Sequence, residues 1–317
     1  MTSSPACLSP APPRSTRRWS AVLAGAAAMA LVGSSTAVSG VLVDAPLWTA
    51  QALRYAVASL LLLAAARASG QRLHRPRGAE WAWLAGVCAV GLVVFNVALV
   101  RGAAHAEPVV IGVAVAGVPL LLALIGPLLE RRRPGPRTVA AAAVVTGGAV
   151  LVQGFGRSDA TGLAWALLVL ACEAGFTLLA VPVLARHGAW GVSVHATWLA
   201  ALAFGALALV VDGPAAVLAL TAADLLATAH LAVGVTAVAF VLWYSAVRRL
   251  GAGRSGLLTG VAPVAAAGSG VLLVGAVPGV VVWAGVVVVA GGLVLGLAPR
   301  RFLPVDLTKP VTMSNDS

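Results

Sequence analysis

Long apolar stretches alternate with short polar segments along nearly all 317 residues of the chain. A helix needs about 20 mostly apolar residues to cross the hydrocarbon layer of a membrane, and the stretches have this length. The pattern predicts ten membrane-spanning helices, the first over about residues 19–43 and the second over about residues 47–68. The others are expected to begin near Glu80, Ala106, Arg137, Thr161, Gly191, Leu225, Arg254 and Pro278. The predicted fold class is therefore an all-α integral membrane protein.

Basic residues mark one side of the predicted helix bundle. When the loops are numbered alternately, 18 of the 21 basic residues fall on the same side. The opposite loops hold only Arg101 and Arg157, together with Asp44, Glu107, Asp159, Asp212 and Asp224. Because loops rich in lysine and arginine stay in the cytoplasm, both termini are predicted to be cytoplasmic. Arginine far outnumbers lysine, a bias typical of GC-rich bacterial genomes, so a bacterial cytoplasmic membrane is expected.

The composition argues against several other classes of protein. With 60% hydrophobic residues, 10% charged residues and a mean hydropathy of +0.99, the chain is too apolar for a soluble domain. The net charge of +11 is dispersed over short loops, which disfavours a nucleic-acid partner. The three cysteines lack metal-ligand spacing, His105 and Glu107 lack the cysteine partners of a zinc-deaminase motif, and no phosphate-binding loop occurs. No metal, cofactor or direct use of ATP is expected.

The two halves of the chain share a pattern. A shift of 144 positions places Pro119 on Pro263, Pro134-Gly135 on Pro278-Gly279 and Gly147-Gly148 on Gly291-Gly292. Other helices match at shifts of 142 and 148, for which chance similarity is the alternative. Residues 19–156 and 157–298 are therefore predicted to be two five-helix repeats, flanked by tails at residues 1–18 and 299–317. Because five spans is an odd number, the second repeat would be inverted, as is common in secondary transporters.

Three short segments have a recognisable pattern. They are Ala52 to Ala56 followed by four leucines, Pro119 to Leu129 followed by Glu130-Arg131, and Leu242 to Val247 with Pro263. These segments resemble the drug/metabolite transporter superfamily, in its ten-helix EamA branch, over about residues 19–298. The family's usual glycine before the acid is absent at Glu130, and the matching turn in the second half has no acid. The resemblance implies export of small metabolites, amino acids or toxic compounds, often driven by an ion gradient.

Glu173 is the foremost candidate for a functional side chain. It lies about 13 residues into the sixth predicted helix, near the membrane midplane. An ionisable residue there costs about 2.5–3.5 kcal/mol on insertion scales, so it is a functional candidate by default. Its carboxyl could bind and release a proton or meet a cationic group of a substrate. The alternative is a neutral, structural carboxyl that hydrogen-bonds to a neighbouring helix.

A polar face on the second predicted helix supplies the next candidates. Gln51, Arg54 and Tyr55 share this face through their spacing of three and four residues. The face could line a polar cavity in which Arg54 holds a substrate carboxylate. Alternatively, Arg54 extends to the outer headgroups and Tyr55 packs in the core.

Further candidates occur on other predicted helices. Asn96, Trp243 and Tyr244 are expected near the central pathway, because they resemble family positions there. Pro119 and Pro263 lie inside predicted helices, where the missing N–H loosens the backbone, so each is either a hinge or a passive kink.

The leading hypothesis is a secondary active transporter, not an enzyme. It would export a small polar or amphiphilic metabolite, amino-acid-like or toxic, by alternating access, with protons as the coupling ion. The expected partners are thus a small-molecule substrate, protons and the lipid bilayer, and a homodimer is left open. A metabolite uptake permease and a membrane-embedded interaction or sensor subunit are the alternatives.

Overall fold

The structure, a computed structural model, describes residues 14–274 and 278–298. Within these residues every regular element is helical, and the β pairing is limited to one isolated bridge between Ala106 and Ser158. Nine helices of the described part are long and apolar enough to cross a membrane. The expected all-α, multi-pass membrane fold is confirmed. Residues 1–13 of the predicted N-terminal tail and the whole predicted tail at 299–317 lie outside the described residues.

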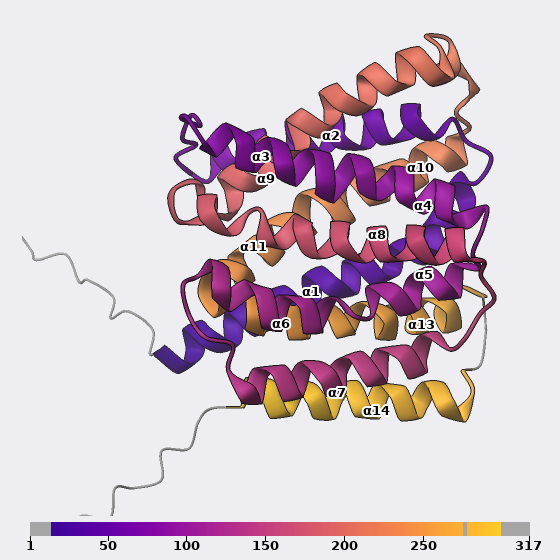
Figure 1. Ribbon diagram of the computed structural model, residues 1–317. Coiled ribbons are helices and arrows are strands. Elements are labelled where there is room, and N and C mark those ends of the chain that lie inside the picture. Colours follow the sequence, from indigo (N-terminus) through magenta and orange to yellow (C-terminus); the bar gives the residue numbers. More distant parts are fainter. Residues whose placement is uncertain (1–13, 275–277, 299–317) are drawn as a thin grey trace, which may run out of the picture.

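The helices run side by side and form one elongated bundle (Figure 1). Those of the first half are α1 (Arg14–Ser39), η1 (Gly40–Leu42), α2 (Leu47–Ala68), α3 (Glu80–Cys88), η2 (Ala89–Val94), α4 (Phe95–Ala103), α5 (Pro108–Val115), α6 (Val118–Leu129) and α7 (Pro136–Gln153). Those of the second half are α8 (Ala160–Leu178), α9 (Val181–Leu207), η3 (Ala208–Asp212), η4 (Ala216–Ala219), α10 (Ala222–His230), η5 (Leu231–Val238), α11 (Ala239–Leu250), α12 (Ala252–Leu257), η6 (Leu258–Gly260), α13 (Val261–Val274) and α14 (Val280–Leu297).

Several consecutive elements join into single spans. Examples are Glu80–Ala103, which contains η2, and Ala222–Leu250, which contains η5. α1, which has 26 residues, packs against α11 and α13. The count of ten spans and the division into two inverted repeats stay predictions.

Most boundaries follow the apolar pattern, and two do not. α2 covers the predicted residues and α3 begins at Glu80, as expected. α1 begins at Arg14, inside the segment expected to be a tail. The predicted start near Gly191 is wrong, because α9 begins at Val181. Its first part ends at Gly188, whose φ of 64° breaks the helix before the apolar stretch that the prediction followed.

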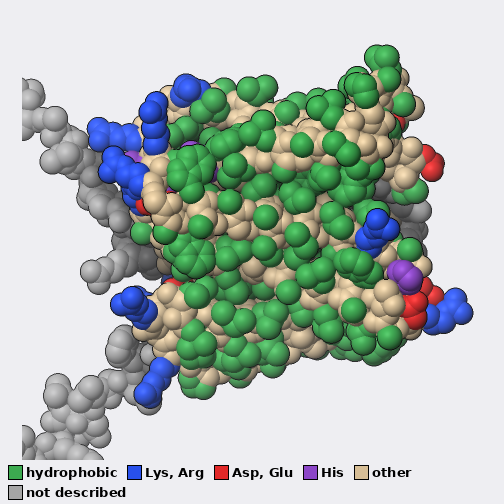
Figure 2. Space-filling view, turned by 45° about the horizontal axis from the view of Figure 1, so that its top comes forward, with side chains coloured by type: hydrophobic (Ala, Val, Ile, Leu, Met, Phe, Trp, Pro, Cys, Tyr) green, Lys and Arg blue, Asp and Glu red, His purple; other side chains and the backbone are tan. Residues whose placement is uncertain are grey.

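The sides of the bundle are apolar and its ends are polar. Figure 2 shows hydrophobic side chains spread over the visible flank, with arginines gathered at the end where α1 begins and α14 ends. Many large apolar side chains are exposed on the surface of the bundle, including Leu272 and Val280, which are 86% and 85% exposed. A water-soluble surface would not carry so many, whereas lipid covers them. We call the two ends of the bundle the arginine-rich end and the opposite end.

Glycines let the helices approach closely. A methyl group built on Gly148 of α7 would lie 2.9 Å from the carbonyl oxygen of Gly285 on α14. The spaced glycine pair Gly292 and Gly296 of α14 likewise faces α7, where a methyl on Gly292 would lie 2.7 Å from Val145. Small residues at helix contacts are the usual device of membrane proteins. In this chain they serve contacts between its own helices.

The two predicted hinge prolines lie close to breaks in their spans. Two turn residues separate α5 from α6, and Pro119 is the second residue of α6. The short 3₁₀ helix η6 separates α12 from α13, and Pro263 stands in the first turn of α13. α5 and α6 both contact α7 and α8, but α6 packs mainly against α12 and α5 mainly against α8; α12 packs mainly against α6 and α13 mainly against α1. Each break therefore joins segments whose main neighbours differ. The hinge role itself stays a prediction.

Candidate functional site

The polar face of α2 meets side chains from two other spans. The Nε2 group of Gln51 donates to the Oδ1 atom of Asn96, just after η2, at 2.9 Å. The Nε group of Arg54 donates to the hydroxyl of Thr236 in η5 at 2.8 Å, and its Nη1 group donates to Gln51 at 3.4 Å. Asn96 and Thr236 are buried, with 8% and 0% exposure. The residues thus form one hydrogen-bonded row across three spans.

Arg54 stays inside the helix bundle. Its guanidinium carbon lies 5.1 Å from the centre of the Tyr55 ring, and its Nε hydrogen bond ends on a fully buried hydroxyl. These contacts differ from the alternative of a side chain extended to the outer headgroups. Among the described residues, its Nη2 group makes no hydrogen bond or ion pair with protein. A guanidinium with free N–H donors can take a carboxylate in a bidentate pair.

Tyr55 packs in the core beside this row. It is 1% exposed, and its ring stacks on Phe204 of α9 with centroids 5.2 Å apart. Trp48 also stacks on Phe204, with ring centroids 6.2 Å apart. The aromatic packing fixes the position of α2 against α9. Tyr55 thereby supports the row more than it lines a cavity.

Glu173 lies on α8, and its side chain is partly buried. It makes no hydrogen bond and no ion pair with any described residue. A structural carboxyl would have a partner, because leaving a polar group unpaired in the protein interior is costly. The hydrogen bond to a neighbouring helix, which was the alternative for Glu173, is not observed among the described residues.

Trp243 and Tyr244 connect α11 to α8. The indole Nε1 group of Trp243 donates to the hydroxyl of Thr177 at 2.9 Å, and the Tyr244 hydroxyl donates to the carbonyl oxygen of Phe176 at 3.1 Å. Both side chains are buried, with 3% and 0% exposure. They hold the helix that carries Glu173 in place. The hydrogen-bond donors of both side chains are used in these contacts.

Thr236 is the site residue that the sequence does not single out. It is a threonine among apolar residues in Leu231–Val238, and threonines of this kind commonly bond within their own helix. Its partner, Arg54, lies 182 positions earlier in the chain. Only the fold brings the two together. The unusual π-helical winding of η5 has no clear signature in the sequence.

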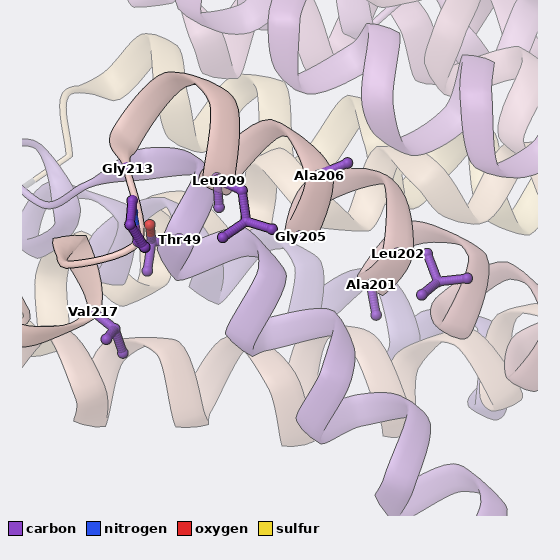
Figure 3. A pocket seen from close by; sticks show the side chains of 10 residues that line it. Thr49, Ala201, Leu202, Gly205, Ala206, Leu209, Gly213 and Val217 are labelled. Atoms are coloured by element: carbon purple, nitrogen blue, oxygen red, sulfur yellow. The ribbon is translucent and has the colours of Figure 1, made fainter.

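A groove on the surface lies apart from this polar row. Figure 3 shows it between α2, α9 and the loop after η3, with Thr49, Leu202, Leu209 and Val217 among its lining residues. Its volume is about 520 Å³, and Leu202 and Leu209 are 65% and 64% exposed. No residue of the polar row lines it. Such an open apolar groove suits lipid rather than a polar substrate.

Short ion pairs hold the loops of the opposite end together. The Arg157 guanidinium donates to Glu107 at 2.9 Å, and this hydrogen bond lowers the pKa of the Glu107 carboxyl. Asp159 accepts from the backbone of Gly162 at 2.7 Å, at the start of α8, and from His105. The Gly162 bond first, and His105 second, lower the pKa of Asp159. The His105–Glu107 string thus takes two separate partners in ordinary loop contacts.

Comparison with known proteins identifies the class. Residues 19–153 and 160–297 each match the model of the EamA-like transporter family. The chain belongs to this family, and it is therefore a transporter of small molecules that lies in a membrane. The match covers both halves of the described bundle.

Individual relatives agree with this assignment. The chain is 28% identical, over 79% of its length and 78% of the relative, to the uncharacterized transporter YetK of Bacillus subtilis. It is 30% identical, over 64% of its length and 67% of the relative, to a probable terminal-alkyne amino-acid exporter of Streptantibioticus cattleyicolor. A solved crystal structure shares the fold, with a TM-score of 0.74 at 23% identity, and covers 88% of this chain and 98% of its own.

Proposed function

We propose that the chain exports a small amino-acid-like or amphiphilic metabolite by alternating access and that proton entry drives it. The proposal rests on one observation: an arginine and a glutamate inside the bundle each keep a polar group that no described residue uses. Arg54 on α2 keeps an unused donor group beside Tyr55, and Glu173 on α8 keeps a carboxyl without a hydrogen-bond partner among the described residues. A cation and an anion that leave each other unpaired are suited to the two charges of a zwitterion.

The arginines and the relatives support the proposed direction and location. Arginines at the end where α1 begins support a cytoplasmic position of that end, in the membrane of a bacterium. The relative named as an amino-acid exporter supports export and an amino-acid-like substrate. Two inverted repeats, at residues 19–156 and 157–298, would supply the two states of alternating access.

Glu173 would be the coupling group. A carboxyl that releases its proton on one side of the membrane and takes one up on the other can exchange protons for substrate. Its carboxyl is only partly buried and has no hydrogen-bond partner among the described residues, which leaves it free to do so. Arg54 would meet the negatively charged group of the substrate, with Gln51 and Asn96 beside it.

The first test compares metabolites inside and outside cells. Cells that overproduce the intact chain, the Glu173→Gln chain, the Arg54→Ala chain or no chain are analysed by untargeted mass spectrometry of medium and cytoplasm. Export predicts a compound enriched outside and depleted inside with the intact chain only. Enrichment inside would indicate an uptake permease. No difference under several growth conditions would contradict transport of an exported metabolite and favour an interaction or sensor role.

The second test addresses proton coupling. Purified chain in lipid vesicles is given the compound found above, with and without a pH difference across the membrane. We expect the pH difference to accelerate transport by the intact chain and to leave Glu173→Gln unaffected. If Glu173→Gln keeps the full response to the pH difference, Glu173 is not the coupling group.

A further inference from the structure

Three spans of the described bundle contain π-helical segments, η2, η3 and η5, and η2 and η5 lie at corresponding places in their spans. In the third span α3, of nine residues, leads into η2, and in the span Ala222–Leu250 α10, also of nine residues, leads into η5. π-helical turns are rare and occur mostly at functional sites, because the wider turn changes the direction in which the following side chains point. The matching positions of η2 and η5 therefore suggest that the two segments have a functional role.

Both π segments direct polar groups towards α2. Thr236 lies within η5, and its hydroxyl accepts the Nε hydrogen bond of Arg54 at 2.8 Å. Asn96 lies two residues after the end of η2, donates at 2.7 Å to the carbonyl oxygen of Leu92 inside η2, and accepts from Gln51 at 2.9 Å. α2 is thus held from two sides, once at its arginine and once at its glutamine.

The hydrogen bond to Thr236 restrains the guanidinium group of Arg54. A guanidinium is planar and has five N–H donors in a fixed arrangement. With Nε held by Thr236 and Nη1 held by Gln51, the plane is set and the Nη2 group is left over. Without the hydroxyl, the side chain could turn about its long stem and extend to the headgroup region.

We propose that Thr236 is a positioning residue of the transport site, whose hydroxyl holds Arg54 so that its terminal N–H groups receive a carboxylate of the substrate. This inference rests on the proposed function. It adds that the span Ala222–Leu250 takes part in substrate recognition through Thr236, and that recognition of the carboxylate depends on a residue that does not touch it.

The test uses one removal, one rescue and one matched control. Thr236→Val keeps the shape and removes the acceptor, and Thr236→Ser restores a hydroxyl. Thr228→Val is the control, because Thr228 lies in the preceding helix α10, is 2% exposed and has a hydroxyl without a hydrogen-bond partner. Thr236→Cys has a similar volume, and its thiol is a weak hydrogen-bond acceptor. It replaces Thr236→Val as the removal variant if Thr236→Val does not fold.

Transport is measured with purified full-length chain in vesicles. The probes are L-leucine, L-norvaline and L-phenylalanine, each paired with the amine that has the same side chain but no carboxylate. Thr236→Val should raise KM for the amino acids about tenfold, the factor that corresponds to about 1.4 kcal/mol of lost binding, and change the maximal rate little. KM for any transported amine should stay unchanged. Thr236→Ser and Thr228→Val should behave like the unaltered chain.

The possible failures are distinguishable. If the unaltered chain transports the amino acids and Thr236→Val has the same KM, the positioning role is wrong although the proposed function holds. If KM rises equally for amino acids and amines, Thr236 has a structural role only, and the proposal is overturned. If the unaltered chain transports no probe with a carboxylate, the proposed substrate class and the role of Thr236 both fail. In the Arg54→Ala chain, Thr236→Val should have no additional effect on KM.

Discussion

Glu130 accepts a hydrogen bond from the backbone N–H of Ala252 at 2.9 Å and thereby joins the end of α6 to the start of α12. The first N–H groups of a helix lack partners within the helix, and a carboxylate there also favours the positive end of the helix dipole. Gly251, with φ of 81°, lets the backbone approach, since a methyl on it would lie 3.1 Å from both carboxylate oxygens. The acid that closes the Pro119–Glu130 motif therefore caps a helix of the other half.

Glu130→Ala should destabilise the chain by about 1–2 kcal/mol, because it leaves this helix start without its cap. The change is measured as a lower thermal unfolding midpoint of detergent-purified protein. Glu107→Ala is the matched control, because its partner Arg157 is 95% exposed and a surface ion pair, even where it orders a loop locally, contributes little to the global free energy of unfolding. An equal loss in both variants would show that Glu130 acts only as a surface charge.

Gly148 and Gly147 make a second matched pair. A methyl on Gly148 would meet the backbone nitrogen of Val289 at 2.7 Å, whereas one on Gly147 would meet nothing within 4 Å. Gly148→Ala should therefore cost about 1–3 kcal/mol through overpacking of α7 against α14. Gly147→Ala should be neutral or slightly stabilising, since alanine favours the helix. The thermal unfolding midpoints of the two variants test this difference. Similar midpoints would contradict the close contact between α7 and α14 at Gly148.

The sequence predicted the spans well because length and hydropathy are properties of each segment alone. α2 has the predicted boundaries, and Gln51, Arg54 and Tyr55 share a face by helical spacing. The start of α9 was missed because the helical residues before Gly188 include the polar pair Arg186 and His187. Apolar patterns do not report such extensions beyond the hydrocarbon layer.

The hydrogen-bond partners of the site residues could not be predicted from the sequence. Thr236 contacts Arg54 only because η5 packs against α2 and winds as a π helix. Trp243 and Tyr244 were candidates for a pocket, but their polar atoms are used in bonds to α8. A side chain's type predicts which bonds it can make, and the packing of other helices decides which bonds it does make.

The loops of the opposite end should loosen in acid. The pKa values of Glu107 and Asp159 are lowered in the folded chain, so their contribution to stability is present above their ordinary pKa values. It is lost as the pH falls below about 4.5 for Glu107 and 3.8 for Asp159, through the lower folded-state values. Hydrogen exchange of residues 154–159, corrected for intrinsic rates, should be steady from neutral pH to about 4.5 and rise below it.

A chain with Glu107→Gln and Asp159→Asn is the control for this loosening. Exchange in its loops should already be faster at neutral pH and should change less on acidification, because the titrating groups are gone. If the double variant shows the same rise below pH 4.5 as the unaltered chain, other groups cause the loosening.

Thr177 and Glu173 lie one helical turn apart on α8 and should have separable effects. Thr177→Val removes the acceptor of the buried Trp243 indole and leaves its N–H unsatisfied, at a cost of about 1–3 kcal/mol. Transport by the folded fraction should keep its KM and its response to a pH difference. Glu173→Gln should instead keep the unfolding midpoint, because no described residue pairs with the carboxyl, and should lose the response to pH. Vesicle transport and thermal unfolding of both variants are compared.

Two outcomes would contradict this separation of effects. A loss of stability in Glu173→Gln as large as in Thr177→Val would make Glu173 a structural residue. An altered KM in Thr177→Val would extend the site to the Thr177–Trp243 contact.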